Sequence, residues 1–140
     1  MTDSTIIHRA RILIVDDCCD TAGLLCELLT LKGYEQVSWA TDADAVRSLH
    51  MANHYGLILL DMHMPNLGGL DVMRHLHTTE PDYYVPVIAI SGDRRYRTVA
   101  MEAGACAFLL KPFSHKEVEA TICNVLSTRY AYMSRFVMSV

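Results

Sequence analysis

Polar residues follow directly after four long apolar runs of the sequence. These residues are Asp16 and Asp17, Asp61, Ser91 and Lys111, and the runs before them cover 12–15, 57–60, 87–90 and 106–110. Continuous apolar runs are typical of strands covered on both faces of a parallel sheet. Ligands of such sheets bind beyond the carboxyl ends of the strands. We therefore expect the polar side chains to converge at one edge of the sheet.

These residue types point to phosphoryl transfer. Three carboxylates crowded together repel one another and would raise the pKa of at least one of them. Lys111 would supply one compensating charge, and Mg²⁺ suits a site with few carboxylates, several waters and a phosphate oxygen. A carboxylate can attack phosphorus and form an aspartyl phosphate, which makes Asp61 the candidate nucleophile. The hydroxyl of Ser91 would hydrogen-bond the product.

A simpler interpretation exists for each residue alone. A single aspartate at the end of a strand is often a helix cap or a turn residue, and Asp61 by itself fits that role as well. The placement of all the polar residues at one predicted edge favours a functional site.

The rest of the chain supplies the elements that would position the site. A more polar strand is predicted at 36–40, at an edge of the sheet, and helices are predicted at 20–32, 43–53, 69–77, 93–103 and 114–127. This alternation gives five βα units and an α/β fold with right-handed crossovers.

Local signals set the expected ends of the helices. Leu24, Leu25, Leu28 and Leu29 share one face of the first helix, and Gly33 and Gly104 close the first and fourth helices. Thr41 with Asp44 and Ser114 with Glu117 are predicted capping pairs. A turn is expected at Pro65, and the third helix is expected to stop at Thr78, Thr79 and Pro81.

Composition narrows the class of protein. The 140 residues suit one domain, and the hydrophobic content of 51% lies in runs shorter than the ~18 residues of a membrane span. The N-terminus lacks the features of a signal peptide, so we expect a soluble, cytoplasmic protein without a membrane partner. With a net charge of −4 and no basic tract, direct nucleic-acid binding is not expected.

The cysteines are expected to be reduced. Their number, five, is odd, and Cys106 and Cys123 fall inside apolar stretches. This pattern predicts core thiols in a reducing compartment and no disulfide framework. The adjacent Cys18 and Cys19 lack the spacing of zinc ligands.

Four stretches of the chain resemble the receiver domain of two-component response regulators. They are ILIVDD at 12–17, LILLDMHMPNLGGLD at 57–71, PVIAISG at 86–92 and GACAFLLKPF at 104–113. The resemblance covers a receiver domain at 9–128, with an N-terminal extension at 1–8 and a tail or the start of a linker at 129–140. It implies a five-stranded parallel sheet with helices on both faces and the flavodoxin-like strand order 2-1-3-4-5, known for the chemotaxis member of the family.

The resemblance also implies roles at the site. Asp61 would accept a phosphoryl group from a phosphohistidine of a sensor histidine kinase or a phosphotransfer protein, with Mg²⁺ required and Mn²⁺ as an alternative. Asp17 and Asp61 would bind the metal directly, and Asp16 mainly through water. The backbone carbonyl of His63 would be a further ligand. Lys111 would contact the phosphoryl group, and its bond to the following proline is commonly cis in the family.

A switch follows from the same resemblance. Ser91 would turn toward the phosphoryl group, and Phe108 would turn inward into the vacated space. An ordinary core role for Phe108 is compatible with this movement. His63 and Asp93 stand at the two positions thought to tune phosphoryl lifetime in the family. We expect His63 on the rim of the site and Asp93 as a cap of the fourth helix.

The implied protein is a regulatory phosphoacceptor domain that assists its own phosphorylation and dephosphorylation, and not an enzyme in the usual sense. Its output would come from binding an unknown downstream protein or from a domain absent from this chain. Arg94, Arg95 and Arg97 are expected on a solvated helix face. Arg95 and Tyr96 are predicted to lie on a partner surface, where a phosphorylation-dependent homodimer is one candidate.

Three other functions are open to test. A phosphatase of the haloacid dehalogenase type needs a second aspartate two residues after its nucleophile, where this chain has His63. A flavodoxin-like cofactor binder needs a first loop that cradles phosphate, but Asp16 and Asp17 would repel a phosphate in the absence of metal. A degenerate receiver that only binds proteins is disfavoured by the complete set of site residues.

Overall fold

The sheet has the predicted order. The computed structural model describes residues 4–64, 68–77 and 84–138. Its strands are β1 (Arg11–Val15), β2 (Gln36–Ala40), β3 (Leu57–Asp61), β4 (Val87–Ser91) and β5 (Ala107–Leu110). They form one five-stranded sheet in the order β2-β1-β3-β4-β5, and every neighbouring pair is parallel. All five carboxyl ends therefore lie at one edge of the sheet.

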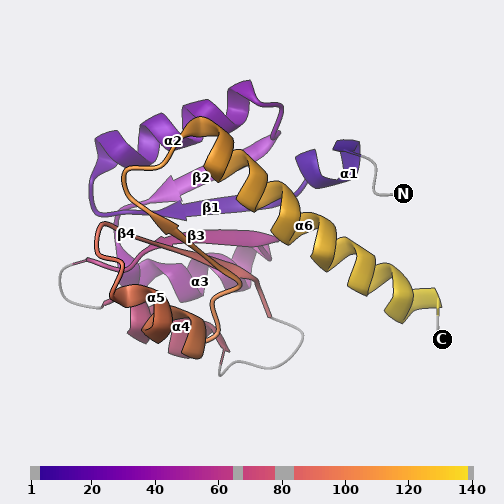
Figure 1. Cartoon of the computed structure of the whole chain (residues 1–140). Coiled ribbons are helices and arrows are strands. Elements are labelled where there is room, and N and C mark those ends of the chain that lie inside the picture. The colour runs from indigo at the N-terminus through magenta and orange to yellow at the C-terminus, as the bar shows by residue number, and fades with distance from the viewer. Residues whose placement is uncertain (1–3, 65–67, 78–83, 139–140) are drawn as a thin grey trace.

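Helices cover both faces of the sheet (Figure 1). The long helices α2 (Cys19–Leu31) and α6 (His115–Met138) lie on one face, together with the short N-terminal α1 (Ser4–His8). The other face carries α3 (Val46–Asn53), α4 (Gly69–His77) and α5 (Tyr96–Glu102), with the 3₁₀ turn η1 (Ala43–Ala45) leading into α3. This arrangement confirms the predicted doubly covered α/β fold.

Each strand contributes to two hydrophobic cores. Ile12 and Ile14 of β1 point into the core beneath α2 and α6, whereas Leu13 and Val15 point into the core beneath α3, α4 and α5. The four residues of β3 before Asp61 are all 0% exposed. Burial on both faces explains why the runs are continuously apolar instead of alternating.

The first and last helices pack on the same core. Ile7 of α1 is 4% exposed and belongs to the core beneath α6, where the half-buried Tyr130 also packs. The ring of His8 contacts that of Tyr34 at a centroid distance of 4.7 Å. The backbone of α6 continues to Met138, so most of the predicted tail at 129–140 belongs to the last helix. Figure 1 shows this helix running past the body of the sheet.

Several local predictions are confirmed. Gly33 and Gly104 have positive φ values of 98° and 111°, in the left-handed region expected just beyond the end of a helix. The hydroxyl of Ser114 accepts a hydrogen bond from the amide of Glu117 at 3.1 Å, as a capping residue does. The turn at Pro65 and the helix stop at Thr78, Thr79 and Pro81 lie outside the described residues.

Other local predictions are wrong. The capping residue is Asp42 and not Thr41, and it caps η1, the turn before α3: its carboxylate accepts the amide of Asp44 at 2.9 Å. Leu24 is 68% exposed because the buried stripe of α2 runs through Ala22, Leu25 and Leu29. Cys106 and Cys123 are exposed free thiols instead of core residues. Their apolar neighbours face the core, and their own positions face away from it.

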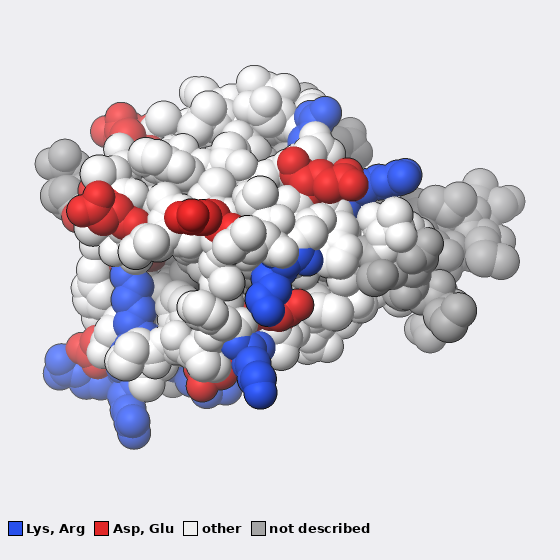
Figure 2. Space-filling model, turned by 90° about the horizontal axis from the view of Figure 1, so that it is seen from above, with Lys and Arg blue, Asp and Glu red and all other residues white. Residues whose placement is uncertain are grey.

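The surface above α2 and α6 carries both signs of charge. On the face seen in Figure 2, acidic and basic side chains are interspersed among mostly uncharged residues. Lys32, the residue after α2, and Glu119 of α6 form an ion pair of 3.5 Å that joins the end of one helix to the other. Among the described residues, no helix combines the length and apolarity needed to cross a membrane.

Candidate functional site

The predicted carboxylates converge. Asp16 follows β1 and Asp61 ends β3, and these strands are neighbours in the sheet. Together with Asp17 they place one carboxylate oxygen each within 4.8 Å of one another. Asp16 and Asp61 are each 6% exposed, whereas Asp17 is open to solvent. The edge of the sheet thus holds two buried carboxylates and one that water can reach.

Loop amides orient the two buried carboxylates. Oδ1 of Asp16 accepts the amide of Cys18 at 2.9 Å, and Oδ1 of Asp61 accepts the amide of His63 at 2.9 Å. The Oδ2 atoms of both residues face Lys111, whose Nζ lies 3.3 Å from Asp16 and 3.5 Å from Asp61. Each carboxylate therefore has one oxygen fixed by its own loop and one shared with a cation.

Lys111 is held by the sheet that carries it. It follows β5, and its amide donates to the carbonyl of Ser91 at 2.8 Å, which continues the pairing of β4 with β5. The bond from Lys111 to Pro112 is cis, as the resemblance implied.

The charge at this edge is unbalanced. Burial raises the pKa of Asp61, an effect that the amide of His63 and the ammonium of Lys111 oppose and that Asp16 adds to. Burial alone would lower the pKa of Lys111, but Asp61 and Asp16 outweigh it and leave that pKa raised. One ammonium group therefore faces an excess of carboxylates.

The donor set suits a hard divalent cation. Its atoms are carboxylate oxygens, which Mg²⁺ prefers, and the exposed Asp17 leaves room for the several waters that Mg²⁺ usually keeps. The excess negative charge described above would be relieved by such a cation.

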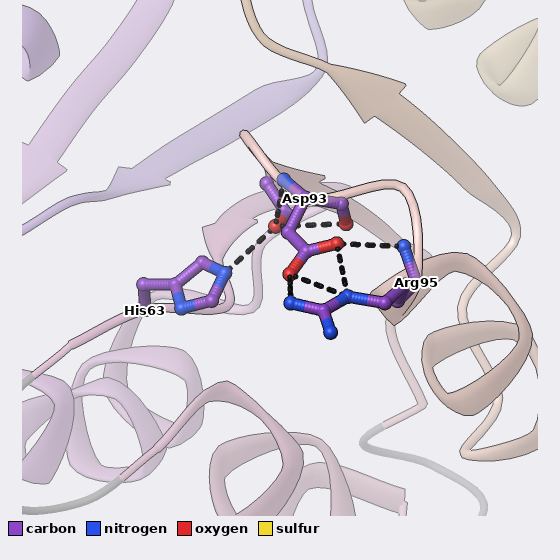
Figure 3. Close-up of polar contacts among 4 residues, drawn as sticks. His63, Asp93 and Arg95 are labelled. Carbon is purple, nitrogen blue, oxygen red and sulfur yellow. Dashed lines mark hydrogen bonds and ion pairs between the residues drawn. The ribbon is translucent and has the colours of Figure 1, made fainter.

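Ser91 is tied to His63. Ser91 ends β4 and is 0% exposed, and its Oγ lies 2.8 Å from Nε2 of His63. The amide of Asp93 donates to the same Oγ at 3.0 Å, and the carbonyl oxygen of Asp93 lies 3.3 Å away (Figure 3). His63 is exposed on the rim, as predicted, but its contact with Ser91 was not predicted. No spacing signal joins a residue in the loop after β3 to one at the end of β4, 28 positions away.

The loop after Ser91 is closed by an ion pair. The guanidinium of Arg95 binds the carboxylate of Asp93, with Nη2 2.7 Å from Oδ2 and Nε 3.1 Å from both oxygens (Figure 3). The backbone amide of Arg95 donates to Oδ1 of Asp93 at 3.0 Å. The side-chain and amide hydrogen bonds of Arg95 lower the pKa of Asp93 to about 2. Asp93 thus caps the turn before α5, and the helix begins at Tyr96, later than predicted.

Tyr96 connects this loop to the rim of the site. Its half-buried ring meets the imidazole of His63 edge-on, with centroids 4.3 Å apart. Its amide donates to the carbonyl of Asp93 at 3.1 Å. Arg95, the exposed residue just before α5, and Tyr96, its first residue, thus lie side by side at the predicted partner surface.

Phe108 lies in the middle of β5 at the edge of the core. It is half-buried and packs against the cluster that also contacts Tyr96. This position is compatible with both the core role and the switch role.

Gly69 brings α4 close to the end of β3. A Cβ at this position would lie 2.8 Å from Cα of Met62 and 3.1 Å from the carbonyl oxygen of Asp61. The absence of a side chain at Gly69 therefore lets the first turn of α4 contact the backbone of Asp61 and Met62. The sequence showed a glycine pair at this place, but not which of the two glycines is needed.

A family model for the response regulator receiver domain matches residues 12–123. The chain is 35% identical over 120 residues to a probable transcriptional regulator, ycf27, of Cyanophora paradoxa, covering 86% of this chain and 49% of that protein. It is 34% identical over 125 residues to the transcriptional regulatory protein PrrA of Mycobacterium tuberculosis, covering 89% and 53%. The chain thus spans about half the length of these relatives.

Solved structures agree with this match. A response regulator receiver domain protein from Clostridium thermocellum superposes with a TM-score of 0.79 at 26% identity, covering 88% of this chain and 98% of that one. NtrX from Brucella abortus superposes with a TM-score of 0.80 at 28% identity, covering 93% of this chain and 29% of that one.

Proposed function

The chain belongs to the family of response regulator receiver domains of two-component systems, and we propose that it is a phosphorylation-dependent switch with Asp61 as its phosphoacceptor. The phosphoryl donor would be a phosphohistidine of a sensor histidine kinase or a phosphotransfer protein. The observation that carries the proposal is the convergence of Asp16, Asp17 and Asp61 on one edge of the sheet, with Lys111 against two of them.

The residues divide the chemistry among themselves. A carboxylate oxygen of Asp61 forms the new bond to phosphorus while the phosphorus–nitrogen bond of the donor imidazole breaks. Asp17 and Asp61 would hold Mg²⁺ directly, Asp16 through water, and the backbone carbonyl of His63 would complete the protein ligands. The bound cation would neutralise charge on the transferring group. Lys111, already beside Asp61, would contact the phosphoryl oxygens.

The switch would start at Ser91. Its hydroxyl would donate to a phosphoryl oxygen on Asp61, and Phe108 would turn inward beside it. Arg95 and Tyr96 would carry the output to a protein partner or to a second copy of the chain. Alanine at either position should weaken partner binding or dimerisation, and unchanged affinities with and without phosphorylation would remove them from the interface.

The deciding experiment is the intact mass of the protein after incubation with acetyl phosphate and Mg²⁺. Wild type should gain one base-labile phosphoryl group, and chelation of the metal should prevent the gain. Asp61→Asn should gain none, whereas Asp44→Asn, which changes an exposed aspartate outside the site, should behave as wild type. If wild type gains no phosphoryl group from acetyl phosphate or from a phosphohistidine donor, Asp61 is not a phosphoacceptor. A protein-binding module then becomes the better interpretation.

A further inference from the structure

The hydroxyl proton of Ser91 is already used in a hydrogen bond in this structure. Within the described part of the chain its hydrogen-bond partners are Nε2 of His63 and the amide and carbonyl of Asp93. A serine hydroxyl has one proton to donate and two lone pairs that accept. The amide of Asp93 occupies one lone pair. The single hydroxyl proton then goes either to the carbonyl of Asp93, with Nε2 of His63 donating to the second lone pair, or to Nε2 itself.

Either tautomer of His63 uses the serine proton inside this set. If Nε2 carries a proton, it donates to Oγ, and the hydroxyl donates to the carbonyl of Asp93 at 3.3 Å. If Nε2 carries none, it accepts the hydroxyl proton itself at 2.8 Å. In both cases Ser91 must give up a hydrogen bond before it can donate to a phosphoryl oxygen on Asp61.

The imidazole of His63 is itself fixed in place. Its backbone amide is bound to Oδ1 of Asp61, so the residue sits on the loop of the proposed phosphoacceptor. Its ring packs edge-on against Tyr96. Asp93, the other partner of Ser91, is held by Arg95 (Figure 3). The hydrogen bond between His63 and Ser91 therefore joins the anchored loop after β3 to the end of β4.

We propose that His63 is a positioning residue that holds the Ser91 hydroxyl against the backbone of Asp93 and opposes its turn toward phosphorylated Asp61. This inference rests on the proposed function. When Ser91 bonds to the phosphoryl group, His63 loses its partner, and the contact between His63 and Tyr96 changes at the first residue of α5. The hydrogen bond between His63 and Ser91 thus sets how readily Ser91 moves toward the phosphoryl group. It also couples this movement to the surface at Tyr96.

The test measures the affinity of the metal-loaded protein for beryllofluoride, a mimic of the phosphoryl group. Loss of one opposing hydrogen bond should make His63→Ala bind about three- to tenfold more tightly than wild type. His63→Gln, whose amide can still reach Ser91, should return to within about twofold of wild type. In a Ser91→Ala background, His63→Ala should change nothing, because the bond is already absent. His115→Ala, an exposed histidine at the start of α6, is the control.

A second readout needs no ligand. The ring resonances of Tyr96 in unligated Ser91→Ala should move toward their positions in beryllofluoride-bound wild type, since both have lost the bond between Ser91 and His63. If wild type binds beryllofluoride and Asp61→Asn does not, but His63→Ala binds no more tightly than wild type, this inference is overturned and the proposed function stands. If wild type itself binds no beryllofluoride, both are overturned.

Discussion

The ammonium nitrogen of Lys111 lies 3.5 Å from Oδ2 of Asp61, although the two residues are 50 positions apart in the sequence. Even so, the pKa of Asp61 stays raised, because burial outweighs the attraction of a single cation that Asp16 also shares. A folded-state pKa above the unfolded value means that ionised Asp61 destabilises the folded protein without metal.

Asp61→Asn should therefore raise the melting temperature in a chelating buffer near neutral pH. Below the ordinary aspartate pKa of 3.8 the carboxyl is protonated in both states, so the destabilisation is absent there. It grows as the pH rises toward the folded-state pKa and is complete above that value. The melting-temperature gap between variant and wild type should thus be largest near neutral pH and close on acidification.

Scanning calorimetry across this pH range checks the prediction. The melting temperature of Asp61→Asn should exceed that of wild type by at least about 2 °C near neutral pH for a domain of this size. Asp44→Asn, at an exposed site, should track wild type throughout. An Asp61→Asn protein that melts below wild type near neutral pH, or a gap that widens on acidification, would contradict the account.

The ion pair beside Ser91 makes a separate prediction. The carboxyl of Asp93, with a pKa of about 2, should titrate nearer 3.8 in Arg95→Gln, because the main cause of the lowered pKa is the side chain of Arg95. Carbon NMR of the Asp93 carboxyl measures this directly. Arg94→Gln, at the neighbouring exposed position, should leave the titration unchanged. If Arg95→Gln also leaves it unchanged, the ion pair does not form in solution.

The close approach of α4 to β3 predicts unequal effects at two neighbouring glycines. Gly69→Ala should destabilise the protein by about 1–3 kcal/mol, because its Cβ would overlap the backbone of Met62 and force the first turn of α4 away. Gly68→Ala should be nearly neutral, since a Cβ there meets nothing within 4 Å. Urea unfolding of the two variants measures the difference. Equal losses would show that the clash is relieved without strain.

The outline of the site was predictable because strand ends are fixed by burial. Runs such as 57–60 can be strands only if both faces are covered, and parallel strands must deliver Asp61, Asp16 and Lys111 to one edge. The strand order followed from the resemblance. The positions of the strands and of their ends depend on patterns of several residues, so a single substitution hardly changes the prediction.

The finer contacts were not predictable because they depend on loop conformation. The hydrogen bond between His63 and Ser91 requires the loop after β3 to reach the end of β4, which no periodicity encodes. The exposures of Leu24 and Cys106 depend on helix rotation and on where a strand starts, and an error of one position reverses the result. The short α1 had too few residues for a periodic signal, so the role of Ile7 was missed and the domain boundary at residue 9 stays a prediction.

Two neighbouring isoleucines in α1 test whether the N-terminal helix belongs to the folded domain. Ile7→Ala should lower the free energy of unfolding by about 2–4 kcal/mol, because the side chain is 4% exposed and packs in the core beneath α6. Ile6→Ala should stay within about 0.5 kcal/mol of wild type, because that side chain is 46% exposed. Urea unfolding followed by circular dichroism measures both. Similar small effects at the two positions would mean that α1 is dispensable and that the folded unit begins near residue 9, whereas a loss confined to Ile7 would extend it to α1.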